Sequence, residues 1–201
     1  MKYQDYVIKN GKFIGKFEEM YQDIEDPWNQ TKKNYVESNI SRQVVCNYIK
    51  LFNIQSIAEF GCGLGKTADF IKRNTNIEVL GIDISKTAIE KAQNNYPNIQ
   101  FIEDDISNIT KYNDCQCFFF SEITWYLLEN QKLDNLIFLI KKSLKGKYLI
   151  HNLTFYKGQQ KYGLEYFSDV DSFIDFVPFK LITKTIVDHQ RLDCIESSLI
   201  F

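Results

Sequence analysis

A glycine-rich turn with an acidic residue in front of it is the strongest chemical signal in the sequence. Residues 59–67 read EFGCGLGKT and follow directly on a short apolar run that has the length of a buried strand. Glycines at a strand-to-helix turn let the backbone turn sharply and approach a ligand closely, with a helix N-terminus just behind them. The pattern therefore predicts a ligand-binding loop.

Three classes of ligand use such a turn, and the spacing of the glycines distinguishes them. A dinucleotide fingerprint, G-x-G-x-x-G, fits the first two glycines but places Lys66 at the third. A P-loop, G-x-x-x-x-G-K-[ST], fits the GKT at its end but places Phe60 at the first glycine. The E/D-x-G-x-G-x-G turn that binds S-adenosylmethionine fits without a gap from Glu59 to Gly65. Glu59 suits this ligand, which is a cation at its sulfonium and amino group, and would repel a triphosphate.

Two carboxylates further along the chain fit the same ligand. Asp83 follows the predicted strand 77–82, where it can accept hydrogen bonds from both ribose hydroxyls. Taken alone, it could equally cap a helix or lie in solvent. After the third predicted strand, Asp105 can accept from the adenine amino group while the next backbone amide, that of Ile106, meets the ring nitrogen. The register favours Asp105 over Asp104.

The elements that must position these residues alternate between strands and helices. The predicted strands are 56–60, 77–82, 99–102, 115–120 and 147–151, with helices expected near 44–52, 65–74, 85–95 and 133–144. This alternation implies parallel βαβ units and a doubly wound α/β sheet with helices on both faces. A short helix after the possible capping box at 168–171 and two strands at 179–187 and 192–200, forming a hairpin at one sheet edge, complete the pattern.

Length and composition predict one soluble globular domain. The chain has 201 residues and a net charge of −2, which argues against a bulk nucleic-acid binder. It shows neither an apolar run of membrane-spanning length nor a signal peptide. Five cysteines without a C-x-x-C pair indicate reduced thiols in a cytoplasmic protein, with Cys115 and Cys117 on one face of a strand.

Taken together, the motifs resemble those of class I S-adenosylmethionine-dependent methyltransferases. The resemblance runs from about residue 35 to the end and rests on residues 58–65, 81–85, 101–106 and 119–127. It implies a Rossmann-like, seven-stranded sheet of order 3-2-1-4-5-7-6 with the last strand antiparallel. It also implies S-adenosylmethionine as the methyl donor and S-adenosylhomocysteine as its product.

The first 40 residues are expected to form a separate helical cap, and residues 41–201 the methyltransferase domain. Six apolar positions recur at helical spacing in the cap and predict one helix laid over the domain: Phe13, Ile14, Phe17, Met20, Tyr21 and Ile24. A short stretch around Asp26-Pro27-Trp28, with Tyr21 before it and Tyr35 after it, resembles the entry segment of small-molecule methyltransferases of the nodulation-factor N-methyltransferase type.

These motifs yield a set of predicted site residues. The predicted cofactor-binding residues are Glu59, Gly61, Cys62, Gly63, Gly65, Asp83, Ile84, Asp105, Ile106 and Ser121. The resemblance implies that Ser121 and Glu122 lie beside the methionine part of the cofactor. The acceptor should lie beyond the carboxyl ends of the strands, near Tyr21, Trp28, Trp125, Tyr126, His151, Asn152, Tyr162 and Tyr166. Tyr162 and Tyr166 belong to a long segment, 156–167, that is either functional or a plain surface loop.

Catalysis of methyl transfer rests largely on positioning and on the exclusion of water. An amine acceptor needs little more than its lone pair aimed at the methyl group, whereas an alcohol would benefit from a general base. His151 and Glu122 are the candidate catalytic residues, and His151 could equally be a structural residue at a strand end. No cluster has metal-ligand spacing, so no metal is expected.

The predicted function is therefore methyl transfer to nitrogen or oxygen of a small metabolite or a saccharide or surface-polysaccharide precursor. The fourth strand ends in SEIT and lacks the Asn/Asp-Pro-Pro-aromatic element of amino-methylating DNA and RNA enzymes, so neither a nucleic-acid nor a membrane partner is expected. Two alternatives stay open. A P-loop nucleotide enzyme would depend on Lys66 and Mg²⁺-ATP, and a regulatory or scaffold subunit would bind the cofactor without turnover.

Overall fold

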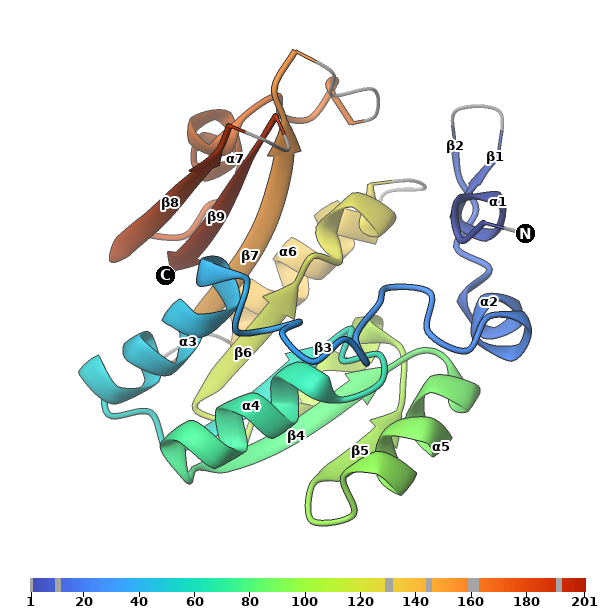
Figure 1. Cartoon of the computed structure of the whole chain (residues 1–201). Coiled ribbons are helices and arrows are strands. Elements are labelled where there is room, and N and C mark those ends of the chain that lie inside the picture. The colour runs from blue at the N-terminus through green and yellow to red at the C-terminus, as the bar shows by residue number, and fades with distance from the viewer. Residues whose placement is uncertain (1, 10–11, 129–131, 144–145, 159–162, 191–192) are drawn as a thin grey trace.

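The computed structural model describes residues 2–9, 12–128, 132–143, 146–158, 163–190 and 193–201. A seven-stranded sheet runs through the molecule (Figure 1). In chain order its strands are β3 (Ser56–Phe60), β4 (Glu78–Asp83), β5 (Gln100–Glu103), β6 (Cys117–Ser121), β7 (Tyr148–Tyr156), β8 (Thr183–His189) and β9 (Cys194–Ile200). Their spatial order is β5-β4-β3-β6-β7-β9-β8, and β9 runs antiparallel to both neighbours. The predicted order 3-2-1-4-5-7-6 with an antiparallel last strand is confirmed.

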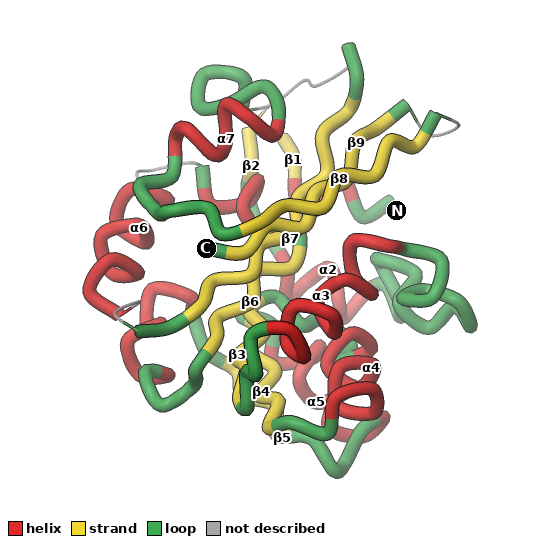
Figure 2. The backbone as a smooth tube through the Cα atoms, turned by 90° about the vertical axis from the view of Figure 1, so that its left-hand side faces the viewer, coloured by secondary structure: helices red, strands yellow, loops and turns green. Residues whose placement is uncertain are grey.

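Helices cover both faces of this sheet, as Figure 2 shows. One face carries α3 (Ile40–Leu51), α4 (Lys66–Thr75) and α5 (Lys86–Asn95), and the other carries α6 (Lys132–Ser143), α7 (Val170–Phe176) and the 3-10 helix η1 (Ile106–Tyr112). Each face therefore has its own apolar core, as expected for a doubly wound fold.

Strand β6 shows why the central strands are apolar throughout. Side chains alternate between the two faces of a strand, so Phe118 and Phe120 pack in the core beneath α6, while Cys117 and Phe119 pack in the core beneath α3 and α4. All four side chains are at most 3% exposed. A strand covered by helices on both faces cannot show an amphipathic alternation.

The N-terminal segment differs from the single helix that its apolar spacing predicted. It contains α1 (Gln4–Val7), a hairpin of β1 (Ile8–Lys9) and β2 (Lys12–Phe13), and α2 (Phe17–Asp23). Gly15, with φ at +59°, turns the chain between β2 and α2, a conformation that a continuous helix cannot contain. Because α3 begins at Ile40, the segment ends near the predicted boundary at residue 40, but the division into cap and domain stays a prediction.

A carboxylate on α2 anchors this segment to the domain. Glu18 accepts hydrogen bonds from the Ser85 hydroxyl (2.7 Å), the Thr87 hydroxyl (2.7 Å) and the Thr87 backbone N–H (3.1 Å). Ser85 is the N-cap of α5, so Glu18 reaches the positive end of that helix. Next to this contact, Met20 and Tyr21 are buried in one apolar cluster with residues of the domain.

Two predicted strands have different limits in the structure. The fourth strand begins at Cys117, and Cys115 lies in the turn before it, so the two thiols do not share a strand face as expected. The fifth strand was predicted to end at residue 151 but continues to Tyr156. The extension pairs antiparallel with β9 along its whole length. Because this pairing is a contact between distant parts of the chain, the local pattern could not show it.

We expect the Glu18 contact to contribute about 1 kcal/mol to the free energy of unfolding, as a helix-capping carboxylate does. Burial alone would raise the pKa of Glu18, but hydrogen bonds from Thr87 and Ser85 lower it to about 2, from an ordinary value of 4.5. Denaturant unfolding at pH 7 should therefore show Glu18→Gln to be less stable than the wild type. The difference should shrink as the pH falls from about 4.5 toward 2, because wild-type Glu18 becomes protonated in that interval.

The matched control is Glu19→Gln on the same helix. Glu19 is exposed and meets only Lys16, at 3.8 Å, so its loss should change the stability by less than about 0.5 kcal/mol. Equal unfolding free energies for the two variants at pH 7 would show that the Glu18 contact does not anchor the segment.

Candidate functional site

A cleft of about 1170 Å³ opens beyond the carboxyl ends of the parallel strands. Residues that end or follow four neighbouring strands line it: Gly61 after β3, Asp83 at the end of β4, Asp105 after β5 and Ser121 at the end of β6. The strand order reverses direction between β3 and β6, and ligands of open α/β sheets bind at such a switch point. The sheet therefore brings the predicted motifs together along one cleft.

The glycine loop is shaped by close approach of other chain segments. Gly61 and Gly63 have φ angles of +77° and +54°. A Cβ atom on Gly61 would overlap the Ile123 side chain. On Gly63 it would lie 2.5 Å from Gln30 Oε1 and 2.7 Å from the Tyr21 hydroxyl oxygen. Only glycine meets both the backbone and the steric requirement here.

Asp83 is held rigidly at the end of β4. Its Oδ2 accepts from the Gly63 N–H (2.9 Å) and its Oδ1 from the Ser85 N–H (3.0 Å). Burial raises its pKa, and these backbone hydrogen bonds oppose the rise. The carboxylate thus links the glycine loop to the start of α5 while it lines the cleft.

The two carboxylates after β5 have different partners. Asp104 accepts hydrogen bonds from the Tyr112 hydroxyl (2.7 Å) and from Lys111 Nζ (3.1 Å), among others. Burial alone would raise the pKa of Asp104, but its hydrogen bonds lower it to about 2. Asp105 caps η1 by accepting from the Ser107 N–H through Oδ1, at 2.8 Å. The Asp104 carboxylate therefore already accepts hydrogen bonds that stabilise the loop. This supports Asp105 as the residue that contacts a ligand.

The buried carboxyl group of Glu59 and the partly buried guanidinium of Arg42 lie near the glycine loop. Glu59 is 1% exposed, and burial raises its pKa to about 8 although the charge of Arg42 lowers it. Arg42 stacks on the Tyr35 ring at 4.1 Å and lines the cleft. Glu59 Oε2 and Arg42 Nε are both buried and have no hydrogen-bond partner among the residues that the structure describes. The amino-acid end of S-adenosylmethionine, with one ammonium and one carboxylate, is the chemical complement of this pair.

Glu122 presents a carboxylate to the cleft in a fixed orientation. Its backbone has φ at +62°, and its carboxylate accepts from the Thr154 N–H (3.0 Å) and hydroxyl (2.9 Å). Thr154 is held in turn by Trp125, whose indole N–H donates to the Thr154 carbonyl at 3.1 Å. Burial raises the pKa of Glu122, and Arg42 opposes the rise. Glu122 is therefore a titratable side chain that lines the cleft and whose position is fixed by Thr154.

His151, the other candidate base, does not line the cleft. Its Nε2 is 2.6 Å from the Thr124 hydroxyl, and its ring packs 4.5 Å from the Phe173 ring. It is 3% exposed, and burial lowers its pKa to about 3. The geometry argues against a base at this position, because β7 directs the side chain into the core beneath α7. Asn152 faces the opposite core and donates to the Ser41 carbonyl.

The other predicted residues divide into two groups. Those lining the cleft are Gly61, Asp83, Ile84, Asp105, Ile106, Ser121, Glu122, Tyr21, Trp28, Trp125 and Tyr126. Glu59, Cys62, Gly63, Gly65 and Tyr166 are not among the described residues that line it, and the Tyr166 hydroxyl donates to the Leu128 carbonyl. Tyr162 lies outside the described residues.

Several cleft residues escaped the sequence prediction. Gln30 donates to the Cys62 carbonyl and accepts from the Leu64 N–H, so these two hydrogen bonds connect the N-terminal segment to the glycine loop. The sequence did offer a signal for Arg42, which is an arginine on the helix before the first strand of the sheet. For Gln30 and Thr154 there was none, because only the tertiary structure brings them to the cleft.

Part of the chain matches a known protein family. Residues 57–147 match the family model described as a methyltransferase domain. No curated protein matches the chain. The motif-based resemblance to class I S-adenosylmethionine-dependent methyltransferases is confirmed by this match and by the fold.

Solved structures share the fold at low identity. The N-methyltransferase NodS from Bradyrhizobium japonicum WM9, in complex with S-adenosyl-L-homocysteine, is 16% identical, with a TM-score of 0.68 over 88% of this chain and 92% of that one. The PH0226 protein from Pyrococcus horikoshii OT3 is 14% identical, with a TM-score of 0.67 over 90% and 97%. Magnesium protoporphyrin IX methyltransferase from Synechocystis PCC 6803, with bound S-adenosylmethionine, is 12% identical, with a TM-score of 0.62 over 92% and 94%.

We expect the imidazole of His151 to stay neutral between pH 5 and 8. Since its pKa is about 3 in the folded state and about 6.5 when unfolded, the unfolded chain takes up the proton first, and stability should fall as the pH drops below about 6.5. An NMR titration of the histidine ring signals, in a His189→Gln variant that leaves one histidine, measures this directly. A midpoint between pH 6 and 7 would restore His151 as a candidate base.

Proposed function

We propose that this methyltransferase-fold chain transfers a methyl group from S-adenosylmethionine to a nitrogen or oxygen atom of a small metabolite or saccharide precursor. The observation that carries the proposal is the alignment of Gly61, Asp83, Asp105 and Glu122 along one cleft at the switch point of the sheet. Each follows or ends a different strand, so a single extended ligand can meet all of them.

The residues present fit the cofactor part by part. Asp83 would accept from the ribose hydroxyls, and Asp105 with the Ile106 amide would meet the adenine edge. Arg42 would pair with the carboxylate of the amino-acid end, and Glu59 with its ammonium. The buried atoms of Arg42 and Glu59 that lack partners support this assignment, because unpaired buried polar groups are costly unless a ligand satisfies them.

When bound, S-adenosylmethionine supplies a methyl carbon that is activated by the adjacent sulfonium. The protein contributes position and a restricted space. Tyr21, Trp28 and Tyr126 line the acceptor side of the cleft and would keep water from the reacting atoms. Glu122, held by Thr154, would orient the acceptor or take its proton.

The two alternatives gain no support from the geometry. Lys66 begins α4 and is absent from the described lining of the cleft, where a P-loop lysine would have to reach the phosphates. A cofactor-binding scaffold would not need Glu122 oriented toward the acceptor side. None of the helices in the described parts has the length and apolar content to span a membrane. A cytoplasmic location stays a prediction.

Calorimetric titration with S-adenosylmethionine, S-adenosylhomocysteine and Mg²⁺-ATP tests the proposal. We expect micromolar binding of the first two ligands and none of ATP. Asp83→Asn should weaken S-adenosylhomocysteine binding at least tenfold, because hydrogen bonds to a charged group are lost in the cleft.

Lys66→Ala is the matched control and should bind S-adenosylhomocysteine as the wild type does, within about twofold. Binding of Mg²⁺-ATP alone, abolished by Lys66→Ala, would contradict the proposal and favour the P-loop interpretation.

A further inference from the structure

The cleft carries an excess of negative charge. Five carboxylates line it, Asp5, Asp83, Asp104, Asp105 and Glu122, against the single guanidinium of Arg42, within the residues that the structure describes. Asp83, Asp104 and Asp105 lie on the cofactor side. Asp5 and Glu122 are left for the acceptor side, where the charge of Arg42 lowers the pKa of Glu122 but does not overcome the effect of burial. An anionic acceptor would therefore be repelled, and a cationic one attracted.

The acceptor side also has an aromatic wall, formed by Tyr3, Phe13, Phe17, Trp28 and Tyr126. The Tyr126 ring lies 5.5 Å from Phe13, 5.2 Å from Phe17 and 6.1 Å from Trp28, and Trp28 lies 4.7 Å from Tyr3. All five residues line the cleft. Aromatic faces carry negative partial charge and bind ammonium groups.

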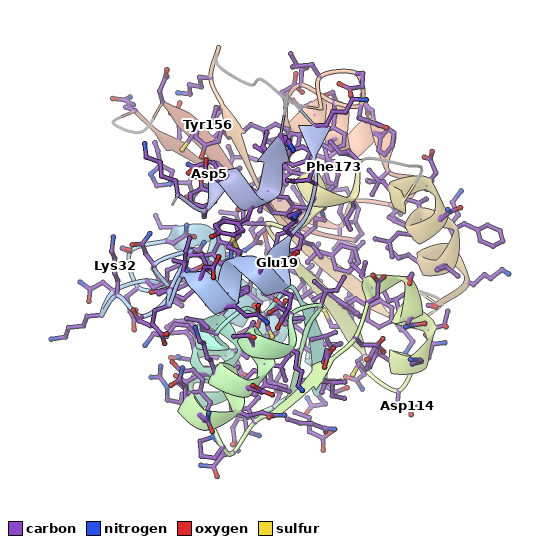
Figure 3. The ribbon with its side chains drawn as sticks, turned by 90° about the vertical axis from the view of Figure 1, so that its right-hand side faces the viewer. Asp5, Glu19, Lys32, Asp114, Tyr156 and Phe173 are labelled. Carbon is purple, nitrogen blue, oxygen red and sulfur yellow. The ribbon has the colours of Figure 1, made fainter. Side chains whose placement is uncertain are left out.

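Glu122 lies close to this wall. Tyr3, Glu122, Tyr126 and Tyr156 all line the same cleft. Burial raises the pKa of the Tyr126 hydroxyl, and the charges of Tyr3, Glu122 and Tyr156 raise it further. Figure 3 shows Asp5 and Tyr156 on the same side of the molecule, where both line the cleft. The acceptor side thus combines aromatic rings with two carboxylates.

We propose that the acceptor is an aliphatic amine that enters the cleft as an ammonium ion, recognised by the aromatic wall and by the Glu122 carboxylate that Thr154 orients. This inference rests on the proposed function and deepens it. An ammonium has no lone pair to attack a methyl group, so it must first lose a proton. Glu122 accepts that proton and becomes the neutral acid, and the nitrogen keeps the electron pair. That pair would form the bond to the methyl carbon while the carbon–sulfur bond breaks, its electrons going to sulfur, so that S-adenosylhomocysteine is the leaving group.

Matched small molecules test this recognition by binding alone. With the protein saturated with S-adenosylhomocysteine, NMR titrations at pH 7 compare cyclohexylamine, cyclohexanol and cyclohexanecarboxylate. These probes share a six-membered ring and differ in charge. We expect the amine to bind at least tenfold more tightly than the alcohol, and the carboxylate to bind more weakly than both.

Two variants separate recognition by charge from general effects. Glu122→Gln keeps the size of the side chain and an acceptor for the Thr154 N–H, and should weaken amine binding about tenfold while alcohol binding stays unchanged. Asp114→Asn removes a carboxylate that is exposed and, in Figure 3, far from Asp5 and Tyr156, and should change neither. Tyr126→Leu removes one ring of the aromatic wall and leaves Glu122 unchanged, and it should also weaken amine binding.

The outcomes distinguish this inference from the proposed function. Equal affinity for the amine and the alcohol, or unchanged amine binding in Glu122→Gln, would overturn the inference, while binding of S-adenosylhomocysteine would leave the proposed function standing. A protein that does not bind S-adenosylhomocysteine would overturn both.

Discussion

Other segments of the chain pack so closely against the glycines of the loop after β3 that no side chain fits there. Much of the site depends on this close packing. Gly61 and Gly63 adopt positive φ angles, and three side chains fill the volume that a Cβ atom would need. Ile123 approaches from the end of β6, and Gln30 and Tyr21 approach from the N-terminal segment. The same backbone turn leaves the Gly63 N–H directed at Asp83. Close approach at this loop thus connects the sheet, the N-terminal segment and the cofactor side of the cleft.

Charge is the second constraint, and it opposes stability. Burial raises the pKa of Glu59, Asp83 and Glu122, which means that the folded state holds their charged forms at a cost. Arg42 offsets part of this cost for Glu59 and Glu122. A cationic ligand would offset more. The cluster is therefore better explained by binding than by folding, since well-packed apolar residues would stabilise the same space more effectively.

The N-terminal segment serves both the fold and the site. Glu18 attaches α2 to the start of α5, the helix that follows Asp83. From that anchored position the segment supplies Gln30 to the glycine loop and four rings of the aromatic wall to the acceptor side. The side of the cleft proposed for the acceptor thus comes largely from outside residues 57–147, the region that matches the methyltransferase family model. The matched region carries the cofactor motifs instead.

The amino-acid sequence was sufficient for the glycine loop and the carboxylates Asp83 and Asp105, because these depend on local patterns and on the rule that parallel strands end at one edge. The strand order followed from the resemblance of the motifs to a known family. The sequence could not place Gln30 or Thr154 in the cleft, nor direct His151 into the core. Each of these depends on contacts between distant segments, above all the pairing of β7 with β9 and the docking of α2. Local sequence specifies which groups are available, whereas tertiary packing decides which of them face the ligand.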